Sequence, residues 1–287
     1  MKNILITGEN GYVGNQFQYL MEKDGFKVER IGLKNDDWKH QSFSKYDVII
    51  HLAALVHNNQ ANAKIIDYMK VNFHLTKELA KKAKKDKVNQ FIFFSTMSVF
   101  GLNGSLLEKC EINQFTPYNP STAYGHSKLL AEKEIRKLEN DTFVVNVVRP
   151  PMIYGKEAPG NFLRLIKVAN ISRIFPRLKN ERSVIHIDNL YKDLLSLVEN
   201  PMSGTIHPQN SEYMNTNTAL SLIRKHQGKR ERIIELPVPK VMKALLGKIG
   251  IINKIYGNLT YSKTIDLRKV NRNQYDSFEQ TIIKTLK

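Results

Sequence analysis

The 287-residue chain lacks the features that define several protein classes. It has a single cysteine, Cys110, so no disulfide can form within the chain and a reducing, cytoplasmic location is expected. Its 15 Gly and 10 Pro are too few for a collagen-like or low-complexity chain. No run reaches the roughly 18 apolar residues that cross a bilayer, and no signal-peptide pattern opens the chain. The composition predicts an ordinary globular protein.

Signatures of several chemistries are also missing from the sequence. It contains no Gly-x-Ser-x-Gly elbow, no P-loop and no His-Glu-x-x-His pattern. The eight histidines and one cysteine show no spacing typical of metal ligands. We therefore expect neither a hydrolase of these classes nor a metal site.

Positive charge is in excess, with a formal net charge of +17. Residues 221–287 hold fifteen Lys and Arg against five Asp and Glu, which makes +10 of that total. No RNP-like sequence, zinc-finger spacing or basic heptad accompanies this surplus, so we do not expect nucleic acid as a partner. Within it, residues 238–256 place apolar residues near helical spacing with lysines between them. We expect this segment to pack in a small domain; the alternative is peripheral association with an anionic membrane.

Short apolar runs alternate with helical stretches over the first 150 residues, which favours β-α-β units and a parallel sheet. The clearest helical stretch covers 63–85, where apolar residues recur near the helical period. The fold class predicted is α/β, a Rossmann-type doubly wound parallel sheet. The strands that we expect are Asn3–Thr7, Lys27–Leu33, Asp47–Leu52, Gln90–Ser95 and Phe143–Arg149.

The alternation becomes irregular after Gly155, where prolines punctuate a second region. This change predicts a smaller C-terminal substrate-binding domain added to the doubly wound one. We assign residues 1–155 plus about 184–210 to a dinucleotide-binding domain. Residues of about 156–183 plus 211–287 are assigned to a nucleotide-sugar-binding domain.

A glycine-rich loop follows the first expected strand and leads into a helical stretch. Gly8 permits the tight turn, Gly11 lets the backbone approach a pyrophosphate, and Gly14 lets the helix pack on the strand. The loop therefore predicts a dinucleotide site. Its spacing, Gly-x-x-Gly-x-x-Gly, resembles that of the short-chain dehydrogenase/reductase superfamily, which implies a Tyr-x-x-x-Lys pair elsewhere in the chain.

Two such pairs occur, Tyr19 with Lys23 and Tyr124 with Lys128. Only Tyr124 follows a strand that ends in hydroxyl residues, so we select Tyr124 and Lys128 with Thr96 as the catalytic residues. Residues four apart share a helix face, so Lys128 is expected near the Tyr124 phenol and to lower its pKa from about 10. Thr96 would hydrogen-bond the same substrate oxygen, and Lys128 would also hold the nicotinamide ribose.

Further motifs resemble the extended branch of that superfamily, the nucleotide-sugar epimerases, dehydratases and reductases. They are His51-Leu52-Ala53-Ala54, Val71-Asn72, Ser95-Thr96-Met97-Ser98-Val99-Phe100-Gly101 and Val148-Arg149-Pro150-Pro151-Met152-Ile153-Tyr154-Gly155. The resemblance implies a homodimer formed through the helices at 63–85 and 121–138. It also implies a set of cofactor-binding residues, namely Gly8, Asn10, Gly11, Tyr12, Val13, Gly14, Lys34, Asp37, Trp38, Leu52, Ala53, Ala54, Asn72, Ser95, Tyr124, Lys128 and Pro150.

Segments 160–165 and 180–190 resemble bacterial capsule and O-antigen enzymes that reduce UDP-4-keto-6-deoxy-N-acetylhexosamines. By that resemblance Asn161 and Arg182 would bind the substrate diphosphate. The other implied substrate-binding residues are Thr96, Met97, Tyr124 and Arg149. The expected partner is a UDP-sugar, and the expected product belongs to the FucNAc or QuiNAc series.

The residues after Thr96 help to decide among dehydration, reduction and epimerisation. Dehydratases of this branch carry an Asp-Glu pair there, whereas this chain has Met97 and Ser98, which cannot do that proton transfer. Reduction and epimerisation remain, since both need only the three catalytic residues and a nicotinamide.

The cofactor preference separates reduction from epimerisation. Lys34 stands where the 2'-phosphate of NADP(H) would lie, so we expect NADP(H) and a 4-keto reductase, with the 4-epimerase as the alternative. Glu9 and the Asp36-Asp37 pair favour NAD(H), and with it a UDP-sugar 4-epimerase that keeps NAD tightly bound. A non-catalytic NADP(H)-sensing protein is a third interpretation, disfavoured by the intact Tyr124 and Lys128.

Overall fold

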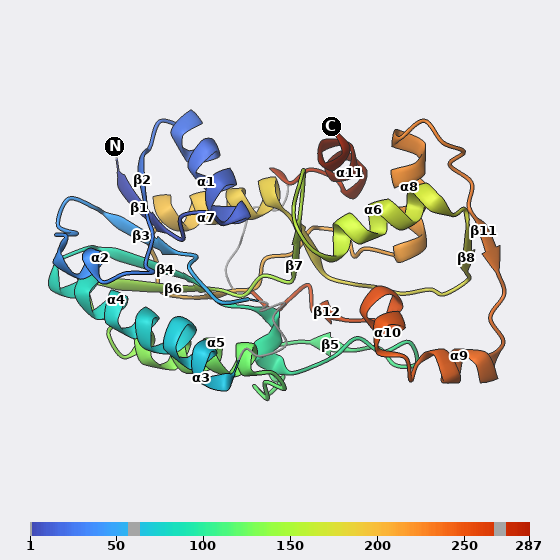
Figure 1. The fold of residues 1–287 in the computed structure, drawn as a ribbon, viewed down its shortest axis with the longest axis horizontal. Coiled ribbons are helices and arrows are strands. Elements are labelled where there is room, and N and C mark those ends of the chain that lie inside the picture. Colours follow the sequence, from blue (N-terminus) through green and yellow to red (C-terminus); the bar gives the residue numbers. More distant parts are fainter. Residues whose placement is uncertain (1, 57–63, 267–273) are drawn as a thin grey trace. The chain divides into compact units, whose positions relative to one another are not determined.

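The computed structural model describes residues 2–56, 64–266 and 274–287, and its chain forms two compact units (Figure 1). Unit 1 comprises Met1–Gly101, Tyr118–Pro150 and Asp193–His207. Unit 2 comprises Leu102–Pro117, Pro151–Lys192 and Pro208–Lys287. The assignment of dinucleotide binding to one region and sugar binding to the other stays a prediction.

Unit 1 is built on one six-stranded sheet in which every pair of neighbouring strands is parallel, in the order β10-β6-β4-β3-β1-β2. The predicted parallel α/β fold is confirmed, and all five expected strands form within two residues of their expected ends. The strands are β1 (Asn3–Thr7), β2 (Lys27–Ile31), β3 (Val48–His51), β4 (Gln90–Phe94), β6 (Val144–Val148) and β10 (Gly204–Ile206).

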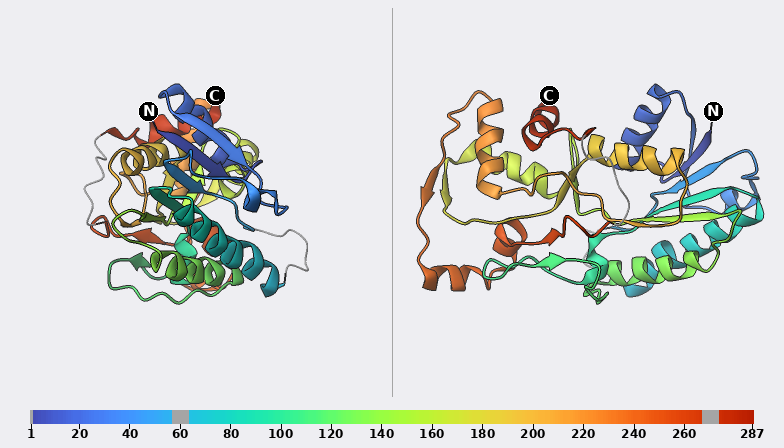
Figure 2. Two further views of the ribbon diagram at one scale, coloured as in Figure 1. Left: turned by 90° about the vertical axis from the view of Figure 1, so that its left-hand side faces the viewer. Right: turned by 180° about the vertical axis from the view of Figure 1, so that it is seen from behind.

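Helices cover both faces of this sheet, which is why its central strands are apolar on both sides. Figure 1 shows α1 on one face and α4 and α5 on the other, and Figure 2 gives the same arrangement from two further sides. The helices are α1 (Tyr12–Lys23), α2 (Asp37–His40), α3 (Ile65–Tyr68), the π-helix η1 (Met69–His74), α4 (Leu75–Lys85), the 3-10 helix η2 (Met97–Phe100) and α5 (Ala123–Arg136). The C-terminal part of α7 (Ile187–Glu199) also belongs to this unit.

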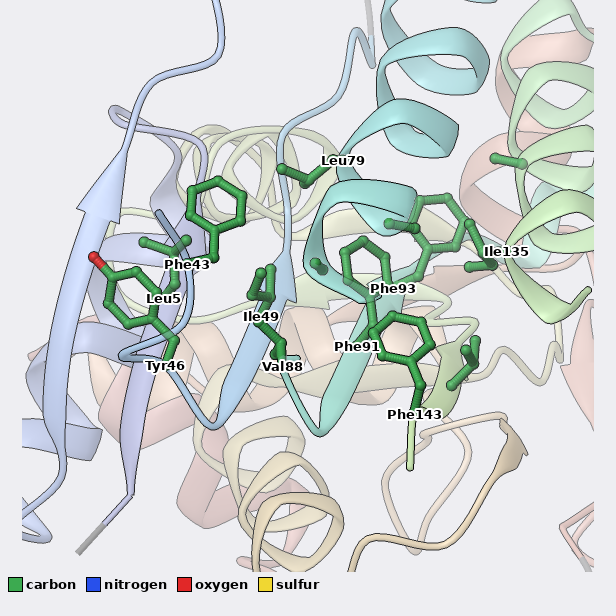
Figure 3. Packing of buried hydrophobic residues seen from close by; sticks show 14 of the residues in the cluster. Leu5, Phe43, Tyr46, Ile49, Leu79, Val88, Phe91, Phe93, Ile135 and Phe143 are labelled. Atoms are coloured by element: carbon green, nitrogen blue, oxygen red, sulfur yellow. The ribbon is translucent and has the colours of Figure 1, made fainter. Parts of the chain in front are cut away.

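Alternation along each strand divides the core of unit 1 between the two faces. On one face Phe91 and Phe93 of β4 pack with Leu79 of α4 and Ile135 of α5 (Figure 3). Towards α1, the ring of Phe94 lies 5.6 Å from that of Phe17. This apolar packing on both faces holds the sheet in place. The positions of the strand ends, and of the loops that follow them, are therefore well defined.

The helical stretch expected at 63–85 forms as three consecutive segments, α3, η1 and α4. Its expected first residue, Ala63, lies outside the described residues. The helix expected at 121–138 is α5. Both stretches belong to unit 1 and contact each other through η1 and α5, while the homodimer that they were expected to form stays a prediction.

Unit 2 contains short strands in two-stranded sheets, all parallel, rather than one large sheet. The pairs are β5 (Glu111–Ile112) with β12 (Thr260–Tyr261), β7 (Met152–Tyr154) with β9 (Val184–His186), and β8 (Ile174–Pro176) with β11 (Ile234–Leu236). The helices that begin in this unit are α6 (Asn161–Ile171), α7, α8 (Thr216–His226), α9 (Lys240–Leu246), α10 (Gly250–Tyr256) and α11 (Phe278–Leu286).

The lysine-rich segment expected to be helical over 238–256 forms two helices, α9 and α10, because the chain turns between Gly247 and Ile249. Val238, Leu246 and Ile252 pack against a small buried cluster of unit 2. Across the described ranges, no helix is both long enough and apolar enough to span a lipid bilayer.

Candidate active site

The glycine-rich loop of unit 1 connects β1 to α1. Gly8 has φ +104, and a Cβ there would lie 3.2 Å from the backbone nitrogen of Ala53, so the turn requires glycine. A Cβ at Gly14 would lie 3.4 Å from the Gly8 carbonyl oxygen, which lets α1 pack close to the loop. At Gly11 a Cβ would meet no heavy atom within 4 Å.

The N-terminus of α1 faces this open space. Gly11 is the N-cap, and no side chain caps the N–H groups of the first turn, which begins at Tyr12 and Val13. Uncapped N–H groups at a helix N-terminus bind phosphate oxygens, and the side chain of Asn10 beside them is exposed. The loop therefore has an open helix N-terminus of the kind that binds phosphate, and its binding of a dinucleotide pyrophosphate stays a prediction.

Three charged side chains surround the end of β2, where a dinucleotide's ribose is recognised. A Cβ at Gly32 would lie 2.9 Å from Oε2 of Glu9, so the Glu9 carboxylate stands beside the strand end. Arg30 donates to the Gly8 carbonyl oxygen at 2.6 Å, and burial lowers its pKa while the charge of Glu9 opposes that shift. Lys34 is exposed. Glu9 and Arg30 therefore lie near one another at this strand end, and Lys34 follows it in the sequence.

The other predicted cofactor residues of unit 1 fall into two groups. Leu52, Ala53 and Ala54 directly follow β3 and are half-buried, beside the Gly8 turn. Trp38 is only 2% exposed and packs in the core, whereas Asp37 next to it is exposed. Of the pair expected to meet the adenine, only Asp37 is therefore open to solvent.

Asn72 lies in the π-helix η1 with its side chain fully engaged by the protein. Its Oδ1 accepts from the Leu55 N–H at 2.7 Å, and its Nδ2 donates to the Leu55 carbonyl at 3.0 Å and to Ser127 Oγ at 3.1 Å. Ser127 Oγ in turn donates to the Tyr124 carbonyl at 2.9 Å. Asn72 thus joins the segment after β3 to the helix that carries Tyr124, a positioning role rather than an open cofactor contact.

The three predicted catalytic residues come from two segments of unit 1. Tyr124 and Lys128 lie one turn apart on α5, whose N-cap Thr122 accepts from the Gly125 N–H at 3.1 Å. Thr96 follows β4 and caps η2 by accepting from the Ser98 N–H at 3.1 Å. A Cβ at Gly125 would lie 2.7 Å from the Ser98 carbonyl oxygen, so glycine lets α5 approach η2.

Burial governs the protonation of these residues. It raises the pKa of Tyr124 to about 12, and a side-chain hydrogen bond with Thr96 opposes that rise. The pKa lowering that the sequence led us to expect from Lys128 is therefore wrong for the protein by itself. The Lys128 ammonium donates to the Phe94 carbonyl at 2.7 Å, and burial lowers the pKa of Lys128 to about 7, against the charge of Glu132.

Arg149, predicted to bind substrate, forms a buried ion pair with Glu132 instead. Its Nη2 and Nε lie 2.5 Å and 3.0 Å from the two carboxylate oxygens, and both side chains are nearly fully buried. Ser95 Oγ donates to the same carboxylate, and Arg149 Nη1 donates to the Tyr118 hydroxyl at 3.1 Å. Burial would lower the pKa of Arg149, but Glu132 outweighs it and raises that pKa.

The ion pair stands at the end of β6, beside the segment that carries Met97. Pro150 follows Arg149, and its carbonyl accepts from the Met97 N–H at 3.1 Å. Our sequence reasoning did not include Glu132, which holds Arg149 and Ser95 beside the candidate site. Its signal was present, because Glu132 follows Lys128 by four residues and so shares its helix face.

The two predicted diphosphate-binding residues belong to unit 2. Asn161 is exposed at the first position of α6. Arg182 Nη1 donates to the carbonyls of Asn253 and Gly257 at 3.2 and 2.7 Å, and burial lowers its pKa. Within the described part of the chain Arg182 has no carboxylate partner, so its charge is held by carbonyl dipoles alone. The same part of the chain contains no group of three or more metal-ligating side chains.

Comparison with known proteins agrees with this geometry. Residues 4–209 match the model of the NAD dependent epimerase/dehydratase family. A UDP-glucose 4-epimerase of Vibrio cholerae is 26% identical over 285 residues, covering 90% of this chain and 86% of that protein.

Solved structures share the fold. The UDP-glucose 4-epimerase of Thermotoga maritima with UDP-glucose has a TM-score of 0.75 and 16% identity, covering 99% of this chain and 97% of that one. The dTDP-4-dehydrorhamnose reductase of Bacillus anthracis in complex with NADP has a TM-score of 0.72 and 18% identity, covering 99% and 98%. At such identity the likeness shows the fold alone.

Proposed function

The chain belongs to the NAD dependent epimerase/dehydratase family, and we propose that it exchanges a hydride at C4 of a UDP-sugar as a 4-epimerase with bound NAD. One observation carries the chemistry: Tyr124, Lys128 and Thr96 lie together where α5 meets η2, beside the end of β4. The family assignment supports an enzyme that uses a nicotinamide cofactor. The UDP-sugar and the epimerisation are the proposal.

The proton steps belong to the protein's own side chains. A bound nicotinamide would supply reversible hydride transfer at C4, through which the C4 hydroxyl is oxidised to a ketone and restored. Tyr124 accepts the O4 proton as the ketone forms and gives it back as the hydroxyl is restored. Thr96 orients O4 by a hydrogen bond. Lys128 would bind the ribose hydroxyls.

Glu9 favours epimerisation over reduction. In dinucleotide-binding folds an acid near the end of the second strand binds the ribose 2'-hydroxyl of NAD, and the Glu9 carboxylate stands beside Gly32 at that place. A carboxylate there also repels a 2'-phosphate. The Vibrio cholerae relative, which matches most of this chain, is named a UDP-glucose 4-epimerase and supports the same choice.

A 4-keto reductase of UDP-4-keto-6-deoxy-N-acetylhexosamines, giving UDP-FucNAc or UDP-QuiNAc, is the second candidate, and Lys34 favours it. This exposed lysine follows β2 and is suited to the 2'-phosphate of NADPH. If Lys34 binds that phosphate, Lys34→Asp lowers the preference for NADPH over NADH. An unchanged preference would remove Lys34 from cofactor recognition.

Arg182 supports a diphosphate-linked substrate. A guanidinium without a carboxylate partner binds phosphate oxygens by charge-assisted hydrogen bonds. Arg182 is held in unit 2 by two carbonyls, which leave its positive charge unneutralised. We assign it, with the exposed Asn161, to the substrate diphosphate.

Tyr124→Phe tests the catalytic assignment. We expect turnover to fall by about 1,000-fold or more, because the proton acceptor is lost, while cofactor binding measured by NADH fluorescence stays nearly intact. The matched control is Tyr19→Phe, since Tyr19 and Lys23 have the same spacing on α1. A Tyr124→Phe enzyme with near wild-type turnover would overturn the assignment.

A further inference from the structure

The outward side of α9 in unit 2 is apolar and open to solvent. Val241, Met242, Leu245 and Ile249 are exposed by 76%, 51%, 59% and 46%. At 100° per residue, Val241, Met242 and Leu245 fall within about 100° of one another on α9, so they form one stripe, and exposed Ile249 follows in the turn before α10. We call these four residues the α9 stripe.

The inward side of the same segment fixes the stripe in place. Leu246 and Val238 pack against the buried cluster of Leu106, Leu178 and Tyr256. The α9 stripe therefore cannot turn into the core without pulling Leu246 out of it.

The charge around the α9 stripe has one sign. Residues 236–256 contain four lysines and no acidic residue, and the lysines are Lys240, Lys243, Lys248 and Lys254. In the described part of the chain none of these four ammonium groups lies within ion-pairing distance of a carboxylate. Other lysines of the chain do have carboxylate partners, for example Lys77 and Lys82 of α4 with Glu134 and Asp86.

We propose that the α9 stripe and its four lysines dock on the surface of an anionic lipid bilayer. Aliphatic side chains flanked by unpaired lysines match such a surface, where apolar atoms enter the headgroup boundary and ammonium groups meet lipid phosphates. Figure 1 shows α9 at the lower edge of unit 2, with α10 following it.

Two other occupants fit the stripe less well. In a two-fold contact between copies of this chain, the stripe would meet itself, and the four lysines would face four lysines. Nucleic acid is bound by basic grooves with exposed aromatic rings for stacking, whereas the exposed centre here is aliphatic and Tyr256 is buried. The lipid surface alone suits both the apolar and the charged parts.

Vesicle co-sedimentation tests the docking with the full chain. We expect the protein to sediment with phosphatidylglycerol-rich vesicles at low ionic strength and to stay in solution with pure phosphatidylcholine vesicles. Salt near 1 M should release most of it, since charge attraction is screened there. No sedimentation with the anionic vesicles at low ionic strength would overturn the proposal.

A matched pair of variants separates this surface from the general positive charge of the chain. Leu245→Glu with Lys248→Glu changes the α9 stripe, and Tyr19→Glu with Lys23→Glu makes the same charge change on α1 of unit 1, where Tyr19 is 65% exposed. We expect the first pair to weaken vesicle binding at least about twenty-fold and the control pair to weaken it far less. Equal losses in both would overturn the assignment to α9. Thermal melting checks that both variants fold.

A tryptophan introduced into the α9 stripe reports whether the stripe inserts into the vesicle bilayer. In Met242→Trp the new indole should shift its emission to shorter wavelength on anionic vesicles, whereas the only native tryptophan, Trp38, is buried in unit 1. An unchanged spectrum during binding would contradict apolar insertion. If light scattering instead shows a dimer that Leu245→Glu with Lys248→Glu separates, a second copy covers the stripe and the lipid proposal fails.

Discussion

Each unit holds one arginine side chain largely out of solvent, and the two arginines differ in the groups that surround their positive charge. Arg149 in unit 1 is paired with both oxygens of Glu132, inside a network that includes Ser95 and Tyr118. Arg182 in unit 2 donates to two backbone carbonyls and, among the described residues, has no carboxylate partner. The charge of the first arginine is matched by a carboxylate within the fold, whereas the second is the residue that we propose to bind the substrate diphosphate.

The difference matters because both residues were expected to bind substrate. A buried arginine whose charge is matched holds elements together, and removing its partner leaves an uncompensated charge. Burial lowers the pKa of an arginine that has no carboxylate partner, as it does for Arg182. A bound anion would stabilise the charged guanidinium. Disrupting the Arg149 ion pair should therefore lower the stability of the protein. Replacing Arg182 should instead weaken its affinity for the substrate.

The largest expected effect is on unit 1. Glu132→Gln should lower the free energy of unfolding by about 3–5 kcal/mol, because the Arg149 charge stays buried without its partner. Urea denaturation measures it, with the exposed Glu139→Gln as control. Glu132→Leu combined with Arg149→Met should recover much of the loss. A stability of Glu132→Gln equal to wild type would mean that Arg149 is not neutralised by Glu132.

The next effect concerns the lysine beside that ion pair. The folded pKa of Lys128 is about 7, against about 10.4 unfolded, so the unfolded state binds more protons between these values. Stability should therefore rise from pH 7 towards pH 10. Lys128→Met should be more stable than wild type by about 1–4 kcal/mol at pH 7 and should lose that advantage near pH 10. Thermal melts of both proteins across this range measure it; parallel pH profiles would contradict the buried charge.

The smallest expected effect on stability, and the one that sharpens the comparison, is at Arg182. Arg182→Met should raise KM for the UDP-sugar about 10- to 100-fold, since charge-assisted hydrogen bonds to the diphosphate are lost. Its unfolding free energy should change by about 1 kcal/mol or less, because no carboxylate is left unpaired. Arg177→Met, an exposed arginine of the same unit, is the control. A large loss of stability with unchanged KM would make Arg182 a structural residue like Arg149.

The elements of unit 1 could be predicted from the sequence because the patterns that define them lie in contiguous residues. Each central strand is a short apolar run bounded by polar residues, and the glycine loop and Tyr-x-x-x-Lys pair are contiguous motifs. Asn3–Thr7 was predicted to its last residue, and α5 within two residues at each end. In unit 2 the strands have two or three residues, too short for periodicity to reveal.

The environments of single side chains were harder to predict than the elements that carry them. Trp38 was expected at the adenine and lies in the core, because four-residue α2 packs its indole inward. Arg149 was expected at the substrate, but its partner comes from another element. The burial of a side chain and its choice of partner depend on residues that are distant in sequence. The order of motifs along the chain does not reveal these contacts.

The most direct test of the proposed reaction is the fate of hydrogen at C4. UDP-glucose and UDP-N-acetylglucosamine labelled with deuterium at C4 would be incubated with the protein and NAD, and the products followed by NMR. We predict the C4 epimer of one or both sugars with its deuterium retained and no net reduction of NAD, in contrast to the Tyr124→Phe enzyme. No epimer from either sugar, together with one NADPH oxidised per UDP-4-keto-6-deoxy-N-acetylhexosamine, would contradict epimerisation and establish the reductase.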